Sequence, residues 1–291
     1  MTRRAWLLFA AMCVIWGVPY LLIRVAVREL HPATLVFFRT GLSAALLLPI
    51  AARRGELRAL LPFWAPLLLF TVLEIGIPWL LLSTAEQRLS SSLTALLIAA
   101  VPLVAATVMR ERLDPRRLLG LVVGLLGVAA LVGLDARGAG LWPLLEIAVV
   151  VLGYATGPIV LSRRLSGVPA LGVVAWSLTI VTVAYAPVAA FQLPASLPSG
   201  RVLASVAGLA VVCTALAFVL FFALIAEAGP VRATVITYVN PAVAAILGVA
   251  LLDEPLTAGM AVGFVLVIAG SVLATRRERI DAVPATAVAE P

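Results

Sequence analysis

Long apolar segments separated by short polar turns run through almost the whole chain. A membrane-spanning helix needs about 20 consecutive, mostly apolar residues. Segments that meet or approach this length lie at residues 5–23, 33–52, 61–83, 90–109, 118–134, 142–161, 170–191, 202–225, 233–252 and 257–275. The pattern therefore predicts an all-α polytopic membrane protein with ten transmembrane helices.

Composition supports the membrane assignment and excludes most soluble functions. The chain is 63% hydrophobic and only 12% charged, whereas soluble domains carry roughly 25% charged residues. Its arginines form short clusters between apolar runs without an aromatic-basic face, which argues against nucleic-acid binding. Cys13 and Cys213 lie inside apolar runs and are expected to be packing residues. With His31 alone in a loop, neither a metal site nor a cofactor is predicted.

The distribution of arginines predicts the orientation. With a cytoplasmic N-terminus, fifteen arginines fall in cytoplasmic segments, five in outer segments and one, Arg39, within the second span. Cytoplasmic loops carry an excess of positive charge, so both termini are predicted to be cytoplasmic in a multi-pass protein of the inner or plasma membrane. The first apolar run lacks a cleavage box and predicts a helix that is retained. Residues 276–291 are predicted to form a disordered cytoplasmic tail.

An internal repeat relates the two halves of the chain. Residues 85–128 resemble residues 226–271, because both begin with Ala-Glu, carry a proline in the next span and reach a glutamate at the following turn. The matching residues are Glu86, Pro102 and Glu111 in the first copy and Glu227, Pro241 and Glu254 in the second. The predicted units, 5–134 and 142–275, hold five helices each. Five is an odd number, so the second unit enters the membrane from the opposite side.

Inverted repeats of this kind are typical of secondary transporters, whose substrate site lies near the midplane between the halves. The alternative is a gene duplication that yields a stable bundle without transport. Transport is favoured because the symmetry coincides with polar and helix-breaking residues at membrane depth.

Short motifs in a fixed order carry a family resemblance. They are WG at 16–17, FFR at 37–39, ALLIAAVP at 95–102, RERL at 110–113, YVNPAVAAILG at 238–248 and DEPLT at 253–257. Over residues 5–275 they resemble the EamA family of the drug/metabolite transporter superfamily. The resemblance implies a ten-helix inner-membrane carrier, often an exporter of amino acids, other small metabolites or drugs. The first copy departs from the pattern, since it is four residues shorter between its proline and its glutamate.

Glu74 is the main candidate for a functional residue inside the membrane. An ionisable group near the middle of a span costs free energy and is a functional hypothesis by default. Glu74 is expected to bind a substrate amine or to carry a proton; a structural glutamate, protonated or paired with an arginine, is the alternative. Pro78, one turn later, frees a backbone carbonyl and shapes the wall of the predicted cavity.

Aromatic and polar residues within the spans are further candidates for the substrate pathway. Those expected to stack on or bond to a substrate are Trp16, Tyr20, Trp79, Tyr154, Thr156 and Trp176. In the ninth span, Tyr238 and Asn240 stand beside Pro241, and this face is predicted to line the central path. An ordinary kink satisfied by neighbouring helices is the alternative there. Pro102 is a corresponding break in the fourth span.

Three further residues are assigned structural roles. Arg39, in the FFR motif, is predicted to position the second helix and either to snorkel outward or to meet Glu74 or Glu146; a direct substrate role is the less favoured alternative. Gly120 and Gly263 belong to small-residue pairs that allow close helix contact. They are predicted to pack the fifth helix against the tenth, with a homodimer contact as the alternative.

The sequence predicts a secondary transporter rather than an enzyme. It carries no phosphate-binding G-x-x-x-x-G-K-[ST] loop, so direct drive by ATP is not expected. Transport is coupled to protons through Glu74 or facilitated down a gradient, and rocking of the halves provides alternating access. A lipid-modifying enzyme would need clustered His, Asp or Glu at one membrane face; a non-transporting subunit would tolerate replacement of the cavity residues.

Overall fold

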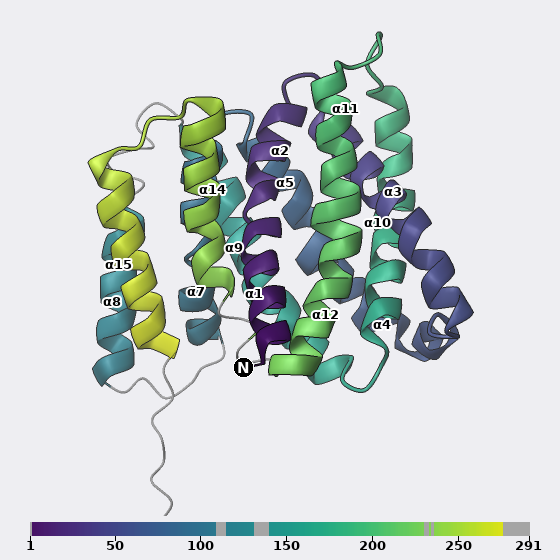
Figure 1. Cartoon of the computed structure of the whole chain (residues 1–291), viewed down its shortest axis with the longest axis horizontal. Helices are drawn as coiled ribbons and strands as arrows, with labels where there is room; N and C mark the ends of the chain where they lie inside the picture. The colour runs from purple at the N-terminus through teal and green to yellow at the C-terminus, as the bar shows by residue number, and fades with distance from the viewer. Residues whose placement is uncertain (1, 109–114, 131–139, 230–232, 234–235, 276–291) are drawn as a thin grey trace, which may run out of the picture.

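The structure is a computed structural model of the chain, and it describes residues 2–108, 115–130, 140–229, 233 and 236–275. The described residues form helices and turns without any strand. Figure 1 shows the helices standing side by side, with α8 and α15 at one edge and α3, α4 and α10 at the other. The predicted tail, residues 276–291, lies outside the described residues, as does Glu111.

The first half of the chain forms helices that match the first five apolar segments. They are α1 (Arg3–Ile15), α2 (Val18–Ala26), α3 (Pro32–Arg53), η1 (Arg58–Phe63), α4 (Trp64–Thr71), η2 (Val72–Gly76), α5 (Ile77–Ala85), α6 (Ser91–Ile98), α7 (Val101–Val108) and α8 (Pro115–Ala130). Several segments predicted as single helices are divided, because short turns or non-α windings interrupt them.

The second half contains fewer interruptions. Its helices are α9 (Leu141–Arg164), α10 (Ala170–Phe191), α11 (Gly200–Ala207), η4 (Gly208–Leu216), α12 (Ala217–Ala228), α14 (Ile236–Leu252) and α15 (Ala258–Thr275). The elements η2 and η4 are π-helical turns. Such widened turns are rare and occur often at functional sites.

Helix length and surface character make this a multi-pass membrane protein. Within the described residues, seven helical segments are long and apolar enough to cross a membrane, and three shorter apolar helices accompany them. The shorter helices, Leu118–Ala130, Ile236–Leu252 and Ala258–Leu273, coincide with the predicted fifth, ninth and tenth spans. Large apolar side chains cover the outside of the bundle; Phe191, for example, is 92% exposed. An apolar surface of this extent requires lipid.

Helices from the two halves pack in pairs. α3 packs against α10, α6 against α14, and α8 against α15; the first and last of these pairs can be followed in Figure 1. Glycines allow the last pair to approach closely: a methyl group on Gly270 would lie 2.6 Å from the carbonyl oxygen of Gly120, and one on Gly127 would lie 2.8 Å from that of Gly263. The two glycines with predicted packing roles thus lie at a contact within one chain.

The first span breaks where α14 crosses it. α1 ends at Ile15 and α2 begins at Val18, so Trp16 and Gly17 form a turn at mid-span. A methyl group on Gly17 would lie 2.6 Å from the Cβ of Val243 in α14, so only glycine permits this approach. The break and the close contact therefore occur at the same point.

Candidate functional site

A group of polar and aromatic side chains lies inside the bundle, surrounded by apolar helices. We call it the central cluster, and its members are Tyr20 from α2, Arg39 from α3, Glu74 from η2, Trp79 from α5, Tyr154 from α9 and Thr214 from η4. It draws on five of the apolar segments. Polar groups at this depth cost free energy unless they are bonded to protein or meet a water-filled path.

Arg39 is held in the central cluster by neutral partners. Its side chain is 7% exposed, its Nε donates to the hydroxyl of Thr214 at 3.0 Å, and its guanidinium carbon lies 3.6 Å from the ring centre of Trp79. The guanidinium therefore neither snorkels nor pairs with a carboxylate within 4.0 Å among the described residues. A cation over an indole face is attracted by the ring quadrupole, more strongly when it is desolvated.

The π turn η4 presents Thr214 to Arg39. The Thr214 hydroxyl donates to the carbonyl of Leu209, five residues earlier, at 2.8 Å. It thereby satisfies a carbonyl in the widened winding and leaves its oxygen free to accept from Arg39. The second half of the chain thus supplies a direct partner for the arginine of the first half.

Glu74 presents a carboxylate oxygen that has no partner among the described residues. It lies on η2, and its Oε2 is buried without a hydrogen-bond partner. The side chain rests against Gly157 of α9, where a methyl group would lie 3.1 Å from the Cβ of Glu74 and would overlap the carboxylate. A buried carboxylate oxygen without a partner is costly, and it is available to a ligand that brings a donor.

Trp79 and Tyr154 join Glu74 to Arg39. Trp79 is 7% exposed and stacks on Arg39. The Tyr154 phenol lies beside the Trp79 indole, and it is close enough to Glu74 and to Arg39 for the charge of each to act on it. Tyr20 is 9% exposed and also lies within electrostatic range of Arg39. The cluster therefore places an unpaired acid, a held cation and aromatic faces around one interior region.

Four other predicted pathway residues lie outside the central cluster. Trp16 packs on the aromatic rings of α12, with its ring centre 4.7 Å from that of Phe221. The Asn240 amide, oriented so that its nitrogen donates, bonds the carbonyls of Ile236 at 3.0 Å and Cys13 at 3.1 Å, which ties α14 to α1. Tyr238 is half-buried on α14.

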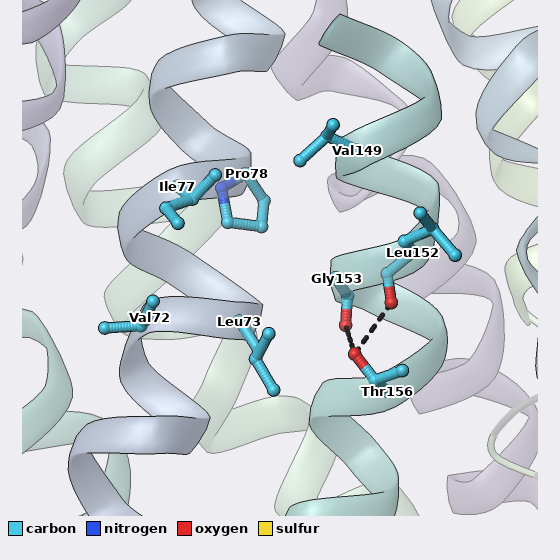
Figure 2. Close-up of a pocket in the computed structure, with 8 residues that line it drawn as sticks. All are labelled: Val72, Leu73, Ile77, Pro78, Val149, Leu152, Gly153 and Thr156. Atoms are coloured by element: carbon cyan, nitrogen blue, oxygen red, sulfur yellow. Dashed lines mark hydrogen bonds between the residues drawn. The ribbon is translucent and has the colours of Figure 1, made fainter. Parts of the chain in front are cut away.

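Thr156 faces a shallow groove between α9 and the segment that contains η2 and α5. Its hydroxyl donates to the carbonyls of Leu152 at 2.7 Å and Gly153 at 3.2 Å, both in its own helix (Figure 2). The remaining groove residues drawn in Figure 2 are Val72, Leu73, Ile77, Pro78 and Val149. Because this lining is apolar and partly exposed, the groove fits a lipid chain better than a polar solute.

The predicted helix breakers have separate local roles. A methyl group on Gly153 would lie 2.9 Å from the Cγ of Pro78, so this proline sets the contact between α5 and α9. Pro102 stands in the first turn of α7, just after the turn that ends α6. Pro241 is buried within α14, next to Asn240. Trp176 donates its indole N–H to the carbonyl of Leu57 at 3.1 Å and so anchors α10.

A second polar site lies at the end of the bundle where α6 begins. The Glu254 carboxylate accepts hydrogen bonds from the backbone N–H groups of Ser91 at 2.8 Å and Ser92 at 2.9 Å, and from both serine hydroxyls. It therefore caps α6 from the loop between α14 and α15 and complements the positive end of the helix dipole. Gly248 leaves room for this carboxylate, since a methyl group there would lie 2.9 Å from the Ser91 hydroxyl.

Sequence reasoning missed Thr214, Gly157 and Glu86 as parts of polar sites. A threonine or a glycine in an apolar segment gives no signal by itself, because its importance depends on a partner far away in the sequence. Glu86 did carry a signal, since the Ala-Glu pair recurs in the second copy of the repeat as Ala226-Glu227.

Comparisons with known proteins agree with this architecture. The model of the EamA-like transporter family matches residues 3–133 and 141–276. A protein of Escherichia coli strain K12, named as the uncharacterized inner membrane transporter YedA, is 29% identical over 255 residues, which cover 85% of this chain and 82% of that protein. The uncharacterized transporter YvbV of Bacillus subtilis strain 168 is 23% identical over 298 residues, covering 99% of this chain and 97% of its own.

A solved structure shares the fold. It is described only as a crystal structure of protein, and it superposes with a TM-score of 0.66 at 22% identity, covering 94% of this chain and 97% of its own. The family model matches both halves of the chain separately, in agreement with the internal repeat. This chain belongs to the EamA-like transporter family.

Proposed function

We propose that the chain is a secondary transporter that exports small polar metabolites, amino acids or related solutes, or drugs, by alternating access. The observation that carries the proposal is the central cluster, in which the buried Oε2 of Glu74 has no partner among the described residues and Arg39 is held on Trp79. A solute with an ammonium group supplies the missing donor to Glu74, and its apolar part packs on the aromatic rings.

The packing of the helices supports ten spans arranged as two inverted repeats, 5–134 and 142–275. The pairs α3–α10, α6–α14 and α8–α15 join the second, fourth and fifth spans to their counterparts. In addition, α5 of the third span packs on α9 of the sixth. The counterpart contact in the other repeat joins the eighth span to the first, where α11 packs on α2. A two-fold axis in the membrane plane generates this pattern.

The two π turns support the same relation. η2 lies in the third span and η4 in the eighth, which are counterparts in the two repeats. Each supplies a residue to the central cluster, Glu74 from η2 and Thr214 from η4. Interrupted helices at corresponding positions of both halves are typical of transporter binding sites and provide points of bending.

Energy coupling follows from the same acid. Glu74 either carries a proton against the solute or binds the solute alone, in which case transport is facilitated down a gradient. Transport from inside to outside requires the orientation given by the arginine bias, with both termini in the cytoplasm and the protein in the inner membrane. The loops that end α5 and begin α6 and α15 then face outward.

The test compares solutes inside and outside cells that express the native chain, Glu74→Gln or an empty vector, at equal membrane abundance. The matched control is Glu29→Gln, which removes an exposed carboxylate. A small polar metabolite that accumulates outside with the native chain and the control, but not with Glu74→Gln, supports the proposal. If no solute differs between the native chain and the empty vector under any load, export is refuted. If export persists in Glu74→Gln, the assigned role of Glu74 is wrong.

A further inference from the structure

Glu86 is a second buried carboxylate, which the proposed transport cycle does not yet use. It is the C-cap residue of α5, it is 0% exposed, and both of its carboxylate oxygens are buried without a hydrogen-bond partner in the part of the chain that the structure describes. Glutamates at the ends of helices are usually exposed, and a buried one is usually paired. The complete burial of both oxygens therefore needs an explanation.

The groups around Glu86 come from each element packed against it. Arg24 of α2 donates its Nη1 to the backbone carbonyl of Glu86, and its charge acts on the carboxylate together with those of Arg39 and Glu254. Tyr20 and Tyr154 are also within electrostatic range of Glu86.

These neighbours do not bond the carboxylate. Arg24 bonds the main chain of Glu86, and neither arginine lies within 4.0 Å of the carboxylate oxygens. Glu254, an acid committed to capping α6, repels a negative charge at Glu86. A sealed carboxylate without donors is far less costly as the neutral acid than as the anion. In this conformation, the surroundings of Glu86 therefore favour a bound proton.

The counterpart of Glu86 in the second repeat lies in the opposite environment. Glu227 is exposed near the end of α12 and accepts a hydrogen bond from the Thr2 hydroxyl at 2.6 Å. In a transporter built from inverted repeats, each half adopts the arrangement of the other when access switches sides. The exposed environment of Glu227 therefore indicates the environment that Glu86 adopts when the outer end of the bundle opens.

We propose that Glu86 is a proton-binding residue of the outer gate, neutral and sealed when the outer side is closed, and ionised and hydrated when it opens. On closing, one carboxylate oxygen takes a proton from water at the outer face; on opening, the O–H bond breaks and the proton returns to that water. The ionised carboxylate of Glu86 then pairs with Arg24, whose guanidinium already donates a hydrogen bond to the backbone carbonyl of Glu86. The inference rests on the proposed inverted-repeat transporter and adds an external pH dependence to its gate.

The test uses Cys213 as a reporter of outward opening. Cys213 is 1% exposed and lies on η4 directly before Thr214, which accepts the hydrogen bond of Arg39. In a Cys13→Ala background, intact cells are treated with a membrane-impermeant methanethiosulfonate reagent at external pH values from acid to mildly alkaline. Thiol reactivity itself rises with pH, so each rate is divided by that of Glu86→Gln, whose amide imitates the neutral acid. Asp253→Asn, which neutralises an exposed acid at the same end of the bundle, is the matched control.

The ratio of the native rate to the Glu86→Gln rate is expected to be near one at acid pH and to rise several-fold toward alkaline pH. Asp253→Asn is expected to follow the native chain, and Glu86→Asp, which keeps a titratable carboxyl, is expected to retain the pH dependence. A ratio that does not change with pH overturns the role of Glu86 and leaves the transporter proposal intact. If Cys213 reacts at no pH in any variant, the outer side does not open, and both proposals are refuted.

Discussion

The contact between Arg39 and Thr214 joins the two halves of the chain at the centre of the bundle, and its strength can be predicted. The perturbations are Arg39→Lys and Thr214→Val, made singly and together. Lysine keeps the positive charge but loses the Nε donor and the planar stack on Trp79. Valine keeps the shape of threonine but removes the hydroxyl that accepts from Arg39 and donates to Leu209.

Each substitution is expected to be destabilising by an amount that follows from the bonds lost. A hydrogen bond to a charged group contributes about 1.5–3 kcal/mol and a neutral one about 1 kcal/mol. A desolvated cation–π contact contributes about 2 kcal/mol, of which lysine retains a part. Arg39→Lys is therefore expected to cost about 3 kcal/mol and Thr214→Val about 2.5 kcal/mol. The double variant should cost about 1.5 kcal/mol less than the sum, since both single variants remove the same bond.

The assay is reversible unfolding of the purified protein in mixed micelles with a rising fraction of denaturing detergent. Thr156→Val is the matched control, because the Thr156 hydroxyl donates to carbonyls of its own helix. The loss of unfolding free energy in Thr156→Val should add to the loss in Arg39→Lys when the two substitutions are combined. Additivity within about 0.5 kcal/mol for Arg39→Lys and Thr214→Val would show that the contact does not join the two halves, and the account of the central cluster would be wrong.

Three further predictions concern other sites. Gly157→Ala is expected to abolish solute export at normal abundance, because its methyl group overlaps the carboxylate of Glu74; unchanged export would contradict the placement of that carboxylate. Glu254→Gln should lower the free energy of unfolding by about 1–2 kcal/mol, because a charged helix cap is lost. Asp253→Asn, at an exposed position with φ 54°, should leave that free energy unchanged. The serine hydroxyl and N–H that begin α11 lower the pKa of Glu29. A carboxyl group whose pKa is lower in the folded protein than in the unfolded chain stabilises the fold above the unfolded pKa, and this stabilisation is lost as pH falls through the folded pKa. The difference in melting temperature between native and Glu29→Gln protein should therefore disappear in acid.

The sequence predicted the helices better than the interruptions within them. The ten apolar segments all contain helix, because apolar length alone specifies a membrane helix. The π turns at 72–76 and 208–216 were not predicted, since neither segment contains a proline. Their windings depend on bonds to other helices, such as the one from the Tyr185 hydroxyl to the Gly76 carbonyl at 3.0 Å.

The candidate site was predicted in part. Tyr20, Glu74 and Trp79 were selected as polar or aromatic groups at membrane depth, and the structure brings them together. Thr156 was selected by the same rule, yet its hydroxyl is satisfied by its own helix, which is a common outcome for threonine in helices. Asn240 bonds backbone carbonyls of α14 and α1. Sequence shows that a polar group is present, whereas its partner is fixed only when helices pack.

The burial of Glu86 illustrates the same limit. In the sequence it stands in a polar stretch, Glu86-Gln87-Arg88, that reads as a turn. Gln87 and Arg88 are exposed in the structure, whereas Glu86 is sealed. Arg24 approaches from α2 and bonds the carbonyl of Glu86, a contact between residues far apart in the chain.

Alternating access between two inverted repeats is the central claim, and distances across both ends of the bundle test it most directly. Spin labels are placed on exposed residues in a cysteine-free background, one pair at Gln87 and Ser196 on the outer side and one at Arg54 and Ala226 on the inner side. Gln87 and Ala226 lie at the ends of the third and eighth spans, and Arg54 and Ser196 follow the second and seventh spans, so the proposed two-fold relation places the two pairs at opposite ends of the bundle. The account predicts two distances for each pair, with conditions that shorten the outer distance lengthening the inner one. A single distance at both ends under all conditions, or two ends that open together, would contradict it.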